Sequence, residues 1–291
     1  MLWVQPIGKL CVLVLRPGLR QRPPLGLQTG RHAHVTALRT FLVLPEPIDL
    51  RRIAVFLDVD GTLLDLASTP HEVRVPPSLL RTLWMMRERT GGAVALVSGR
   101  LIGDLDFVFS PLRFSAVGGH GAEIRLDPYG AIVEQTTLPL DAELKRRLKE
   151  VASHHRNVIV EDKGHSVALH YRLALDEGLP VVDEVFHTCK GFAPNSYELL
   201  TGKAVIEIKS PGFDKGTAVR TLMNHAPFSG RMPIFVGDDT TDEAAFAVVP
   251  EYGGVAISVG RKVPGVDGRF QSPDDVRRWL ERLSNVVVAP Q

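Results

Sequence analysis

Residues 53–62 read IAVFLDVDGT, and this stretch decides the fold. Its first five residues form a continuous apolar run, which is typical of a strand buried on both faces of a parallel sheet. Two carboxylates, Asp58 and Asp60, follow the run, and Gly61 allows the chain to turn there. Because ligands of open parallel sheets bind beyond the carboxyl ends of the strands, the stretch predicts an α/β protein with an acidic site at one sheet edge.

Further along the chain, buried strands alternate with amphipathic helices. Apolar runs at 93–97, 234–236 and 255–257 predict strands, and helices are predicted near them. A last helix begins at Ser272-Pro273, where serine can cap the helix and proline suits the first position. This alternation predicts an open, Rossmann-like parallel sheet.

The middle of the chain breaks this alternation. Asp141 can cap an amphipathic helix, and two alternating segments, 158–163 and 166–172, flank Gly164-His165 as the strands of a β-hairpin would. One hairpin face is polar and carries Glu161, Lys163, Ser166, His170 and Arg172. We therefore expect a small α+β domain over residues 138–202, inserted into a core made of residues 49–137 and 203–291.

Composition excludes several classes of protein. The chain has 291 residues, and its 34 basic and 33 acidic side chains leave a formal charge of +1, which argues against nucleic-acid binding. No apolar run approaches the roughly 20 residues that cross a bilayer. The two cysteines have neither disulfide-framework nor zinc-site spacing, which favours a reducing compartment. We expect a cytoplasmic monomer without nucleic-acid or membrane partners.

The first 45 residues differ from the rest because they are basic and contain no acidic residue. A secretory signal is disfavoured, since Arg16-Pro17 interrupts the apolar run, and the absence of serine disfavours a mitochondrial leader. We expect residues 1–48 to be a poorly ordered basic extension, or the result of a start site assigned too far upstream.

Polar residues follow several of the predicted strands. Asp58 and Asp60 follow the first strand, Ser98 the second and Asp238 a later one, so they are expected to meet at one edge. Clustered carboxylates repel one another unless a cation or a proton intervenes, and hard oxygen ligands favour Mg²⁺. Lys215 at a helix start adds a positive charge suited to phosphate. Clustered carboxylates, an expected metal ion and a lysine suited to phosphate together indicate phosphoryl chemistry.

Four motifs give this chemistry a specific resemblance. DVDGT at 58–62, VSGR at 97–100, DKG at 214–216 and GDDTTDE at 237–243 resemble, in order and spacing, those of haloacid-dehalogenase-type phosphatases. Within that superfamily the chain is similar to the trehalose-6-phosphate phosphatase family, because it also has GHGAE at 119–123, EIKSPG at 207–212 and the two polar hairpin strands. The resemblance implies a haloacid-dehalogenase core with an inserted cap domain and covers the chain from about residue 50.

The resemblance also implies roles. Asp58 would be the nucleophile that forms an aspartyl-phosphate, and Asp60 the general acid and base. Mg²⁺ would be held by Asp58, the Asp60 carbonyl and Asp238. Asp239 and Asp242 would lie outside these metal ligands and support them. The groups expected at the phosphate are Ser98, Lys215, Gly61 and Thr62. The residues expected to bind substrate are Arg100, His120, Glu123, Glu161, Lys163, His170, Arg172, Glu207 and Lys209.

Structural alternatives stay open for the weaker positions. Ser98 alone is more often a helix cap, and the polar hairpin face alone is more often a solvated face. Glu207 and Lys209 could form a hinge pair between domains. At the level of function, the core motifs do not separate trehalose 6-phosphate from sucrose phosphate or a hexose phosphate. A non-catalytic phosphosugar sensor is a further alternative, although a sensor has no need of Asp60.

Overall fold

The computed structural model describes residues 49–67, 69, 72–135 and 139–285. The extension expected over residues 1–48 lies outside these residues. In the described part of the chain, no helix combines the length and the apolar character that a membrane crossing requires.

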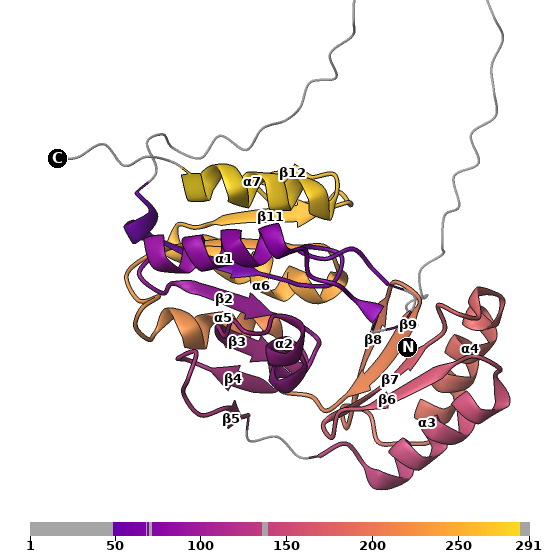
Figure 1. The fold of residues 1–291 in the computed structure, drawn as a ribbon. Coiled ribbons are helices and arrows are strands. Elements are labelled where there is room, and N and C mark those ends of the chain that lie inside the picture. Colours follow the sequence, from indigo (N-terminus) through magenta and orange to yellow (C-terminus); the bar gives the residue numbers. More distant parts are fainter. Residues whose placement is uncertain (1–48, 68, 70–71, 136–138, 286–291) are drawn as a thin grey trace, which may run out of the picture. The chain divides into compact units, whose positions relative to one another are not determined.

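A large sheet forms the centre of the core, with strand order β12-β11-β10-β1-β2-β3-β4-β5 (Figure 1). Its strands are β1 (Ile53–Leu57), β2 (Val94–Val97), β3 (Ser115–Gly118), β4 (Glu123–Arg125), β5 (Val133–Glu134), β10 (Met232–Gly237), β11 (Val255–Val259) and β12 (Gly268–Phe270). Pairing is parallel from β12 through β3, and β4 and β5 add antiparallel. The predicted α/β class with a parallel sheet is confirmed.

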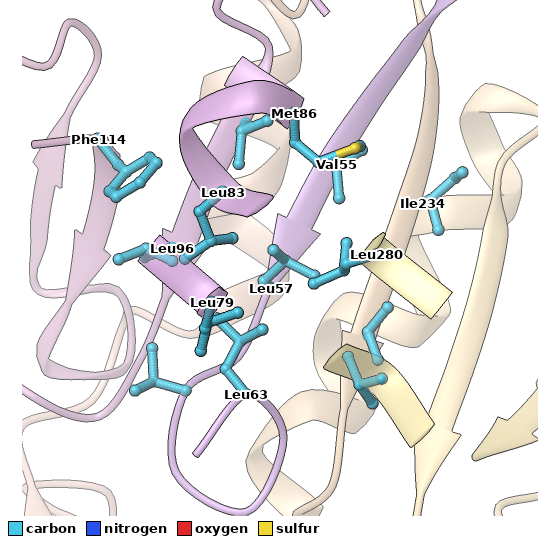
Figure 2. Packing of buried hydrophobic residues seen from close by; sticks show 14 of the residues in the cluster. Val55, Leu57, Leu63, Leu79, Leu83, Met86, Leu96, Phe114, Ile234 and Leu280 are labelled. Carbon is cyan, nitrogen blue, oxygen red and sulfur yellow. The ribbon is translucent and has the colours of Figure 1, made fainter. Parts of the chain in front are cut away.

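Both faces of this sheet are covered by helices because β1 is apolar on both sides. Val55 and Leu57 pack in one cluster with α1 (Pro77–Arg89) and α7 (Pro273–Asn285), as Figure 2 shows. Ala54 and Phe56 pack in a second cluster with α5 (Lys215–Met223) and α6 (Glu243–Val248). All five β1 residues are buried, and Asp58, which follows the strand, is buried as well.

The inserted segment forms a second, antiparallel sheet with strand order β6-β7-β9-β8. Its strands are β6 (Ile159–Asp162), β7 (Ser166–His170), β8 (Glu198–Gly202) and β9 (Val205–Lys209), and its helices are α3 (Ala142–His154) and α4 (Gly178–Cys189). The apolar sides of β7 and β9 pack on these helices in one cluster. The predicted hairpin is present, since Glu161 pairs with Ala168 and therefore lies on the same face as His170.

Strand β9 lies beyond residue 202, where we expected the inserted domain to end. In this strand Ile206 and Ile208 point to the helix cluster and alternate with Glu207 and Lys209, which are on the opposite face. Lys203-Ala204 is the turn between β8 and β9, whereas the sequence pattern predicts the return to the core there. The smaller sheet therefore extends through Lys209.

Candidate active site

A cavity of about 300 Å³ lies between the acidic edge of the large sheet and residues of the smaller sheet. Asp58, Ser98 and Asp238 line it from the ends of β1, β2 and β10, where ligands of a parallel sheet bind. The smaller sheet and its neighbouring turns contribute the polar residues Glu161, Lys163, His170, Arg172, Lys203 and Glu207. Residues from distant parts of the sequence therefore surround one space.

A buried ammonium group joins the acidic residues at the base of the cavity. Asp214 caps α5 by accepting from the Thr217 N–H, which places Lys215 at the first helical position. Lys215 Nζ lies 2.8 Å from Asp58 Oδ1 and 2.6 Å from Asp242 Oδ1, and its side chain is 2% exposed. Burial by itself lowers the pKa of Lys215. The charges of Asp242 and Asp58 raise this pKa by more than burial lowers it, so the ammonium form is favoured.

Asp242 has both carboxylate oxygens engaged within the protein. Oδ1 accepts from Lys215, and Oδ2 accepts the backbone N–H groups of Asp238 and Asp239, each at 2.9 Å. The Asp239 side chain accepts from the Thr240 N–H, and Asp239 and Asp242 each accept the other's backbone N–H in a capping box at the 3₁₀ turn Thr240–Asp242. Asp242 thus fixes the backbone that carries Asp238.

The acidic cluster fits a divalent cation. Carboxylate oxygens of Asp58, Asp238 and Asp242 lie within 4.8 Å of one another. Burial, together with the charges of its acidic neighbours, raises the pKa of Asp58, against the opposing effect of Lys215. Burial also raises the pKa of Asp238. Asp58 and Asp238 line the cavity, whereas Asp242 does not, so Asp58 and Asp238 are the carboxylates placed to offer oxygen to Mg²⁺, a hard cation that prefers such ligands.

Glycine is required at residue 61 for two reasons. Gly61 has a φ of +83°, and a Cβ there would overlap the Asp238 carboxylate. Gly61→Ala should therefore displace Asp238 and weaken Mg²⁺ binding by about tenfold or more, the effect expected when a ligand is misplaced. Isothermal titration calorimetry with MgCl₂ measures this. Gly164→Ala is a matched control, since Gly164 has a φ of +81° but open space around its Cβ position; equal affinities in both variants would contradict the prediction.

Asp60 is held apart from the acidic cluster by Arg100. Arg100 donates Nε to Asp60 Oδ2 at 2.6 Å and Nη2 to Oδ1 at 2.8 Å, a bidentate pair at the cavity wall. Burial lowers the pKa of Arg100, but its hydrogen bond and ion pair with Asp60 outweigh this and raise it. The Asp60 side chain remains 30% exposed, so it can still be reached from the cavity.

Two of the four residues expected to bind phosphate line the cavity, and two do not. Ser98 is buried beside the cavity, and its Oγ accepts the Arg100 N–H at 3.2 Å. Lys215 lines the cavity as well. Thr62 is fully buried and donates to Asp238 Oδ1 at 3.3 Å, and neither it nor Gly61 is among the lining residues. The side chain of Thr62 therefore supports an acidic residue.

Glu207 is the centre of a polar network in the smaller sheet. Its carboxylate accepts from Ser166 Oγ at 2.6 Å and Lys163 Nζ at 3.1 Å, and it lies 3.2 Å from His120 Nε2. Lys163 also donates to the Gly99 carbonyl at 2.9 Å, which links the hairpin to the loop after β2. Burial by itself raises the pKa of Glu207. The charges of Lys163 and His120 have the larger, opposite effect and bring this pKa well below its ordinary value.

Two more hairpin residues line the cavity. Glu161 and His170 are joined by a hydrogen bond of 2.9 Å. Burial raises the pKa of Glu161, but that hydrogen bond and the charge of Lys163 lower it below its ordinary value. Arg172 donates to the carbonyls of Ala67 and Lys203. The polar hairpin face thus lies against the cavity.

Two residues expected at the substrate are held by structural contacts instead. Glu123 accepts the Ile102 N–H at 2.7 Å, at the start of α2 (Ile102–Val108). Lys209 is buried, donates to the Phe213 carbonyl at 2.6 Å and pairs with Glu198 at 2.5 Å. Neither is among the cavity-lining residues. Lys209 thus ties the end of β9 to the returning chain, whereas Glu207, its partner in the hinge alternative, lines the cavity.

Sequence reasoning missed several lining residues. Lys203 donates to Asp238 Oδ2 at 2.5 Å from the turn between β8 and β9, but a lone lysine in a turn carries no sequence signal. Asp104, Phe107 and Val108 line the cavity from α2. They occupy positions i, i+3 and i+4 of one short helix, and this spacing was the available signal.

His165, at the hairpin tip, makes stability depend on pH. Its ring lies edge-on to Phe213, and burial lowers its pKa from 6.5 to about 4, although the charge of Glu207 opposes this. Between these values the unfolded chain binds more protons than the folded one, so stability falls as pH drops from about 6.5 to 4.

His165→Gln should remove this part of the pH dependence, whereas His187→Gln, at an exposed position on α4, should not. Urea unfolding at pH 7.5, 5.5 and 4.5 measures the difference. If wild type and His165→Gln lost stability in parallel over this range, the effect would not come from His165.

Comparisons with known proteins agree with one another. A model of the trehalose-phosphatase family matches residues 56–272. A probable trehalose-phosphate phosphatase of Sinorhizobium fredii is 43% identical over 241 residues, covering 83% of this chain and 88% of the relative. The trehalose-6-phosphate phosphatase of Escherichia coli is 34% identical over 239 residues, covering 81% and 88%. The C-terminal domain of Candida albicans trehalose-6-phosphate phosphatase superposes with a TM-score of 0.71 at 20% identity, covering 81% and 93%, and shares the fold.

Proposed function

Because this chain belongs to the trehalose-phosphatase family, we propose that it hydrolyses trehalose 6-phosphate to trehalose and inorganic phosphate. Family membership makes the chain a phosphoric monoester hydrolase, and the substrate and mechanism are the proposed steps. One observation carries the proposal. Asp58, Asp238 and Lys215 share a single cavity with Glu161, Lys163 and Glu207, so phosphate chemistry and a hydroxyl-binding surface meet in one space.

Asp58 is the proposed nucleophile. Its carboxylate would attack phosphorus in line, forming an O–P bond while the bond to the sugar oxygen breaks. Lys215 holds this carboxylate from inside the protein, 2.8 Å away, which fixes its orientation. Hydrolysis of the resulting aspartyl-phosphate releases inorganic phosphate and restores the carboxylate.

Asp60 is the proposed general acid and base. It would give a proton to the leaving sugar oxygen and later take one from the water that hydrolyses the intermediate. Arg100 donates to both carboxylate oxygens, so this contact has to open before Asp60 can reach the leaving sugar oxygen. Phosphate entry supplies a competing anion for Arg100.

Mg²⁺ is the proposed cofactor. Asp58, Asp238 and the Asp60 carbonyl would hold it, with Asp242 and Asp239 supporting the loop behind Asp238. When bound, it would offset the negative charges of nucleophile and phosphate. Ser98 and Lys215 would hold the phosphoryl oxygens from the protein side.

We propose that the segment over residues 139–209 is the cap of the enzyme. Lys163 and Glu207 already connect its sheet to Gly99 and His120 of the core. Such contacts would close the cavity over a bound sugar and exclude water. Glu161, His170 and Arg172 then present donors and acceptors to its hydroxyl groups.

Phosphate release from purified protein tests the proposal. Trehalose 6-phosphate, glucose 6-phosphate and sucrose 6-phosphate are compared with Mg²⁺, with EDTA, and with Mg²⁺ restored. We expect a preference of about 100-fold or more in kcat/KM for trehalose 6-phosphate, because unmatched buried polar groups penalise the other sugars. Activity should vanish in EDTA and return with Mg²⁺. Equal or higher kcat/KM on another sugar phosphate would reject the substrate, and EDTA-resistant activity would reject the cofactor.

A further inference from the structure

Besides its polar hairpin residues, the cavity has four larger apolar lining residues from the core, here called the apolar wall, which have no role in the phosphate chemistry. These residues are Leu66, Val73, Phe107 and Val108. We propose that this wall binds the apolar face of the sugar ring that carries no phosphate, and that Phe107 thereby sets a preference for disaccharide over monosaccharide phosphates. The inference rests on the proposed function and deepens it.

The wall is a consequence of how α2 packs. Ile102, Leu105 and Phe109 are buried and attach the helix to the hydrophobic core of the large sheet. Phe107 is exposed and lines the cavity together with Asp104 and with Val108, which also packs against the core. The helix therefore has apolar residues on both sides, whereas a surface helix of this length normally presents polar residues to solvent.

Phe107 is the unusual member of this wall. It is 83% exposed, the highest value among the large hydrophobic residues in the described part of the chain. Leu66, another wall residue, is 40% exposed. Exposed apolar side chains that share a cavity wall indicate a surface that a ligand covers, whereas scattered ones do not.

Sugar chemistry identifies the part of the substrate that fits. A pyranose ring has C–H groups on its faces and hydroxyl groups around its rim, so it needs an apolar surface beside polar partners. Phe107 offers an aromatic face, and Glu161 and His170 offer hydrogen-bonding groups in the same cavity. The apolar residues can therefore contact the face of a sugar ring while the polar residues bind the hydroxyl groups around its rim.

The position of Phe107 along α2 indicates that it contacts the sugar ring without phosphate and not the ring that carries phosphate. The helix begins after Leu101, next to Ser98 and Arg100, where the phosphate is expected. Phe107 is six residues beyond this cap, about 9 Å along the helix axis at 1.5 Å per residue. A hexose phosphate anchored at Ser98 would end short of Phe107, whereas a disaccharide would continue toward it.

Steady-state kinetics of Phe107→Ala on trehalose 6-phosphate and glucose 6-phosphate test the proposal. We expect KM for trehalose 6-phosphate to rise about tenfold with kcat unchanged, and KM for glucose 6-phosphate to change by less than about twofold, since one lost apolar contact has an effect of this size. Phe107→Trp should keep the wild-type KM. Tyr129→Ala, at another exposed aromatic residue that does not line the cavity, is the matched control and should change neither KM.

The outcomes separate the inference from the proposed function. Equal effects of Phe107→Ala on both substrates, a change in kcat alone, or no effect on trehalose 6-phosphate would overturn the role of Phe107 and leave the function intact. If the wild-type protein failed to hydrolyse trehalose 6-phosphate, both would be rejected. Thermal unfolding of Phe107→Ala should match that of the control, because the side chain adds little to the core.

Discussion

Asp58→Asn should lower kcat by about 10⁴-fold or more, since an amide cannot form the covalent bond to phosphorus on which turnover depends. The substitution preserves shape, and Lys215 keeps Asp242 as a partner. Burial and acidic neighbours raise the pKa of Asp58 in the folded protein, so the ionised group destabilises the fold at pH values above its unfolded pKa. Thermal stability of Asp58→Asn at pH 7.5 should therefore be equal to or higher than that of wild type.

Phosphate release and thermal unfolding measured on the same preparation check both parts. Asp183→Asn, at an exposed position on α4, is the matched control and should change neither. Residual kcat above about one per cent would be too high for a missing nucleophile. A large fall in melting temperature would show instead that Asp58 has a structural role.

Lys215→Met should have the largest effect on stability, a loss of about 3 to 5 kcal/mol, because removing one partner of a buried ion pair leaves uncompensated charge. The ammonium lies between Asp58 and Asp242, which are themselves close to Asp238. With it removed, carboxylates in a buried cluster repel one another. Activity should fall together with stability, since Asp58 and the phosphate both lose a cation.

Urea unfolding of wild type and three variants measures this effect. Lys190→Met, at an exposed lysine after α4, should unfold like wild type. Lys215→Met combined with Asp242→Asn should regain part of the stability but not the activity, because one repelling charge is removed while the phosphate ligand stays absent. If Lys215→Met alone were as stable as wild type, the buried ion pair could not be what holds the acidic cluster together.

Features encoded within a short stretch of sequence could be predicted. The apolar run before Asp58 specified β1, and Asp214 and Asp141 cap α5 and α3 as expected. Each depends on residues a few positions apart, such as a buried run or a side-chain oxygen facing a free N–H. For the same reason the strand ends that bring Asp58, Ser98 and Asp238 together could be inferred.

Features that depend on pairing between distant segments could not be predicted from the sequence. Strand β9 was assigned to the core because only its partners β7 and β8 show that it belongs to the smaller sheet. Glu123 looked like a ligand, yet the N–H group of Ile102 takes its carboxylate. The bidentate contact between Arg100 and Asp60 likewise joins residues forty positions apart, and the sequence pattern contains no signal for it.

Quantifying trehalose and inorganic phosphate formed from trehalose 6-phosphate tests the central claim most directly. The wild-type protein with Mg²⁺ should release one trehalose for each phosphate, and Asp58→Asn should release neither. Phosphate without trehalose, glucose in place of trehalose, or full release by Asp58→Asn would contradict the claim that this site hydrolyses the phosphate ester of trehalose through Asp58.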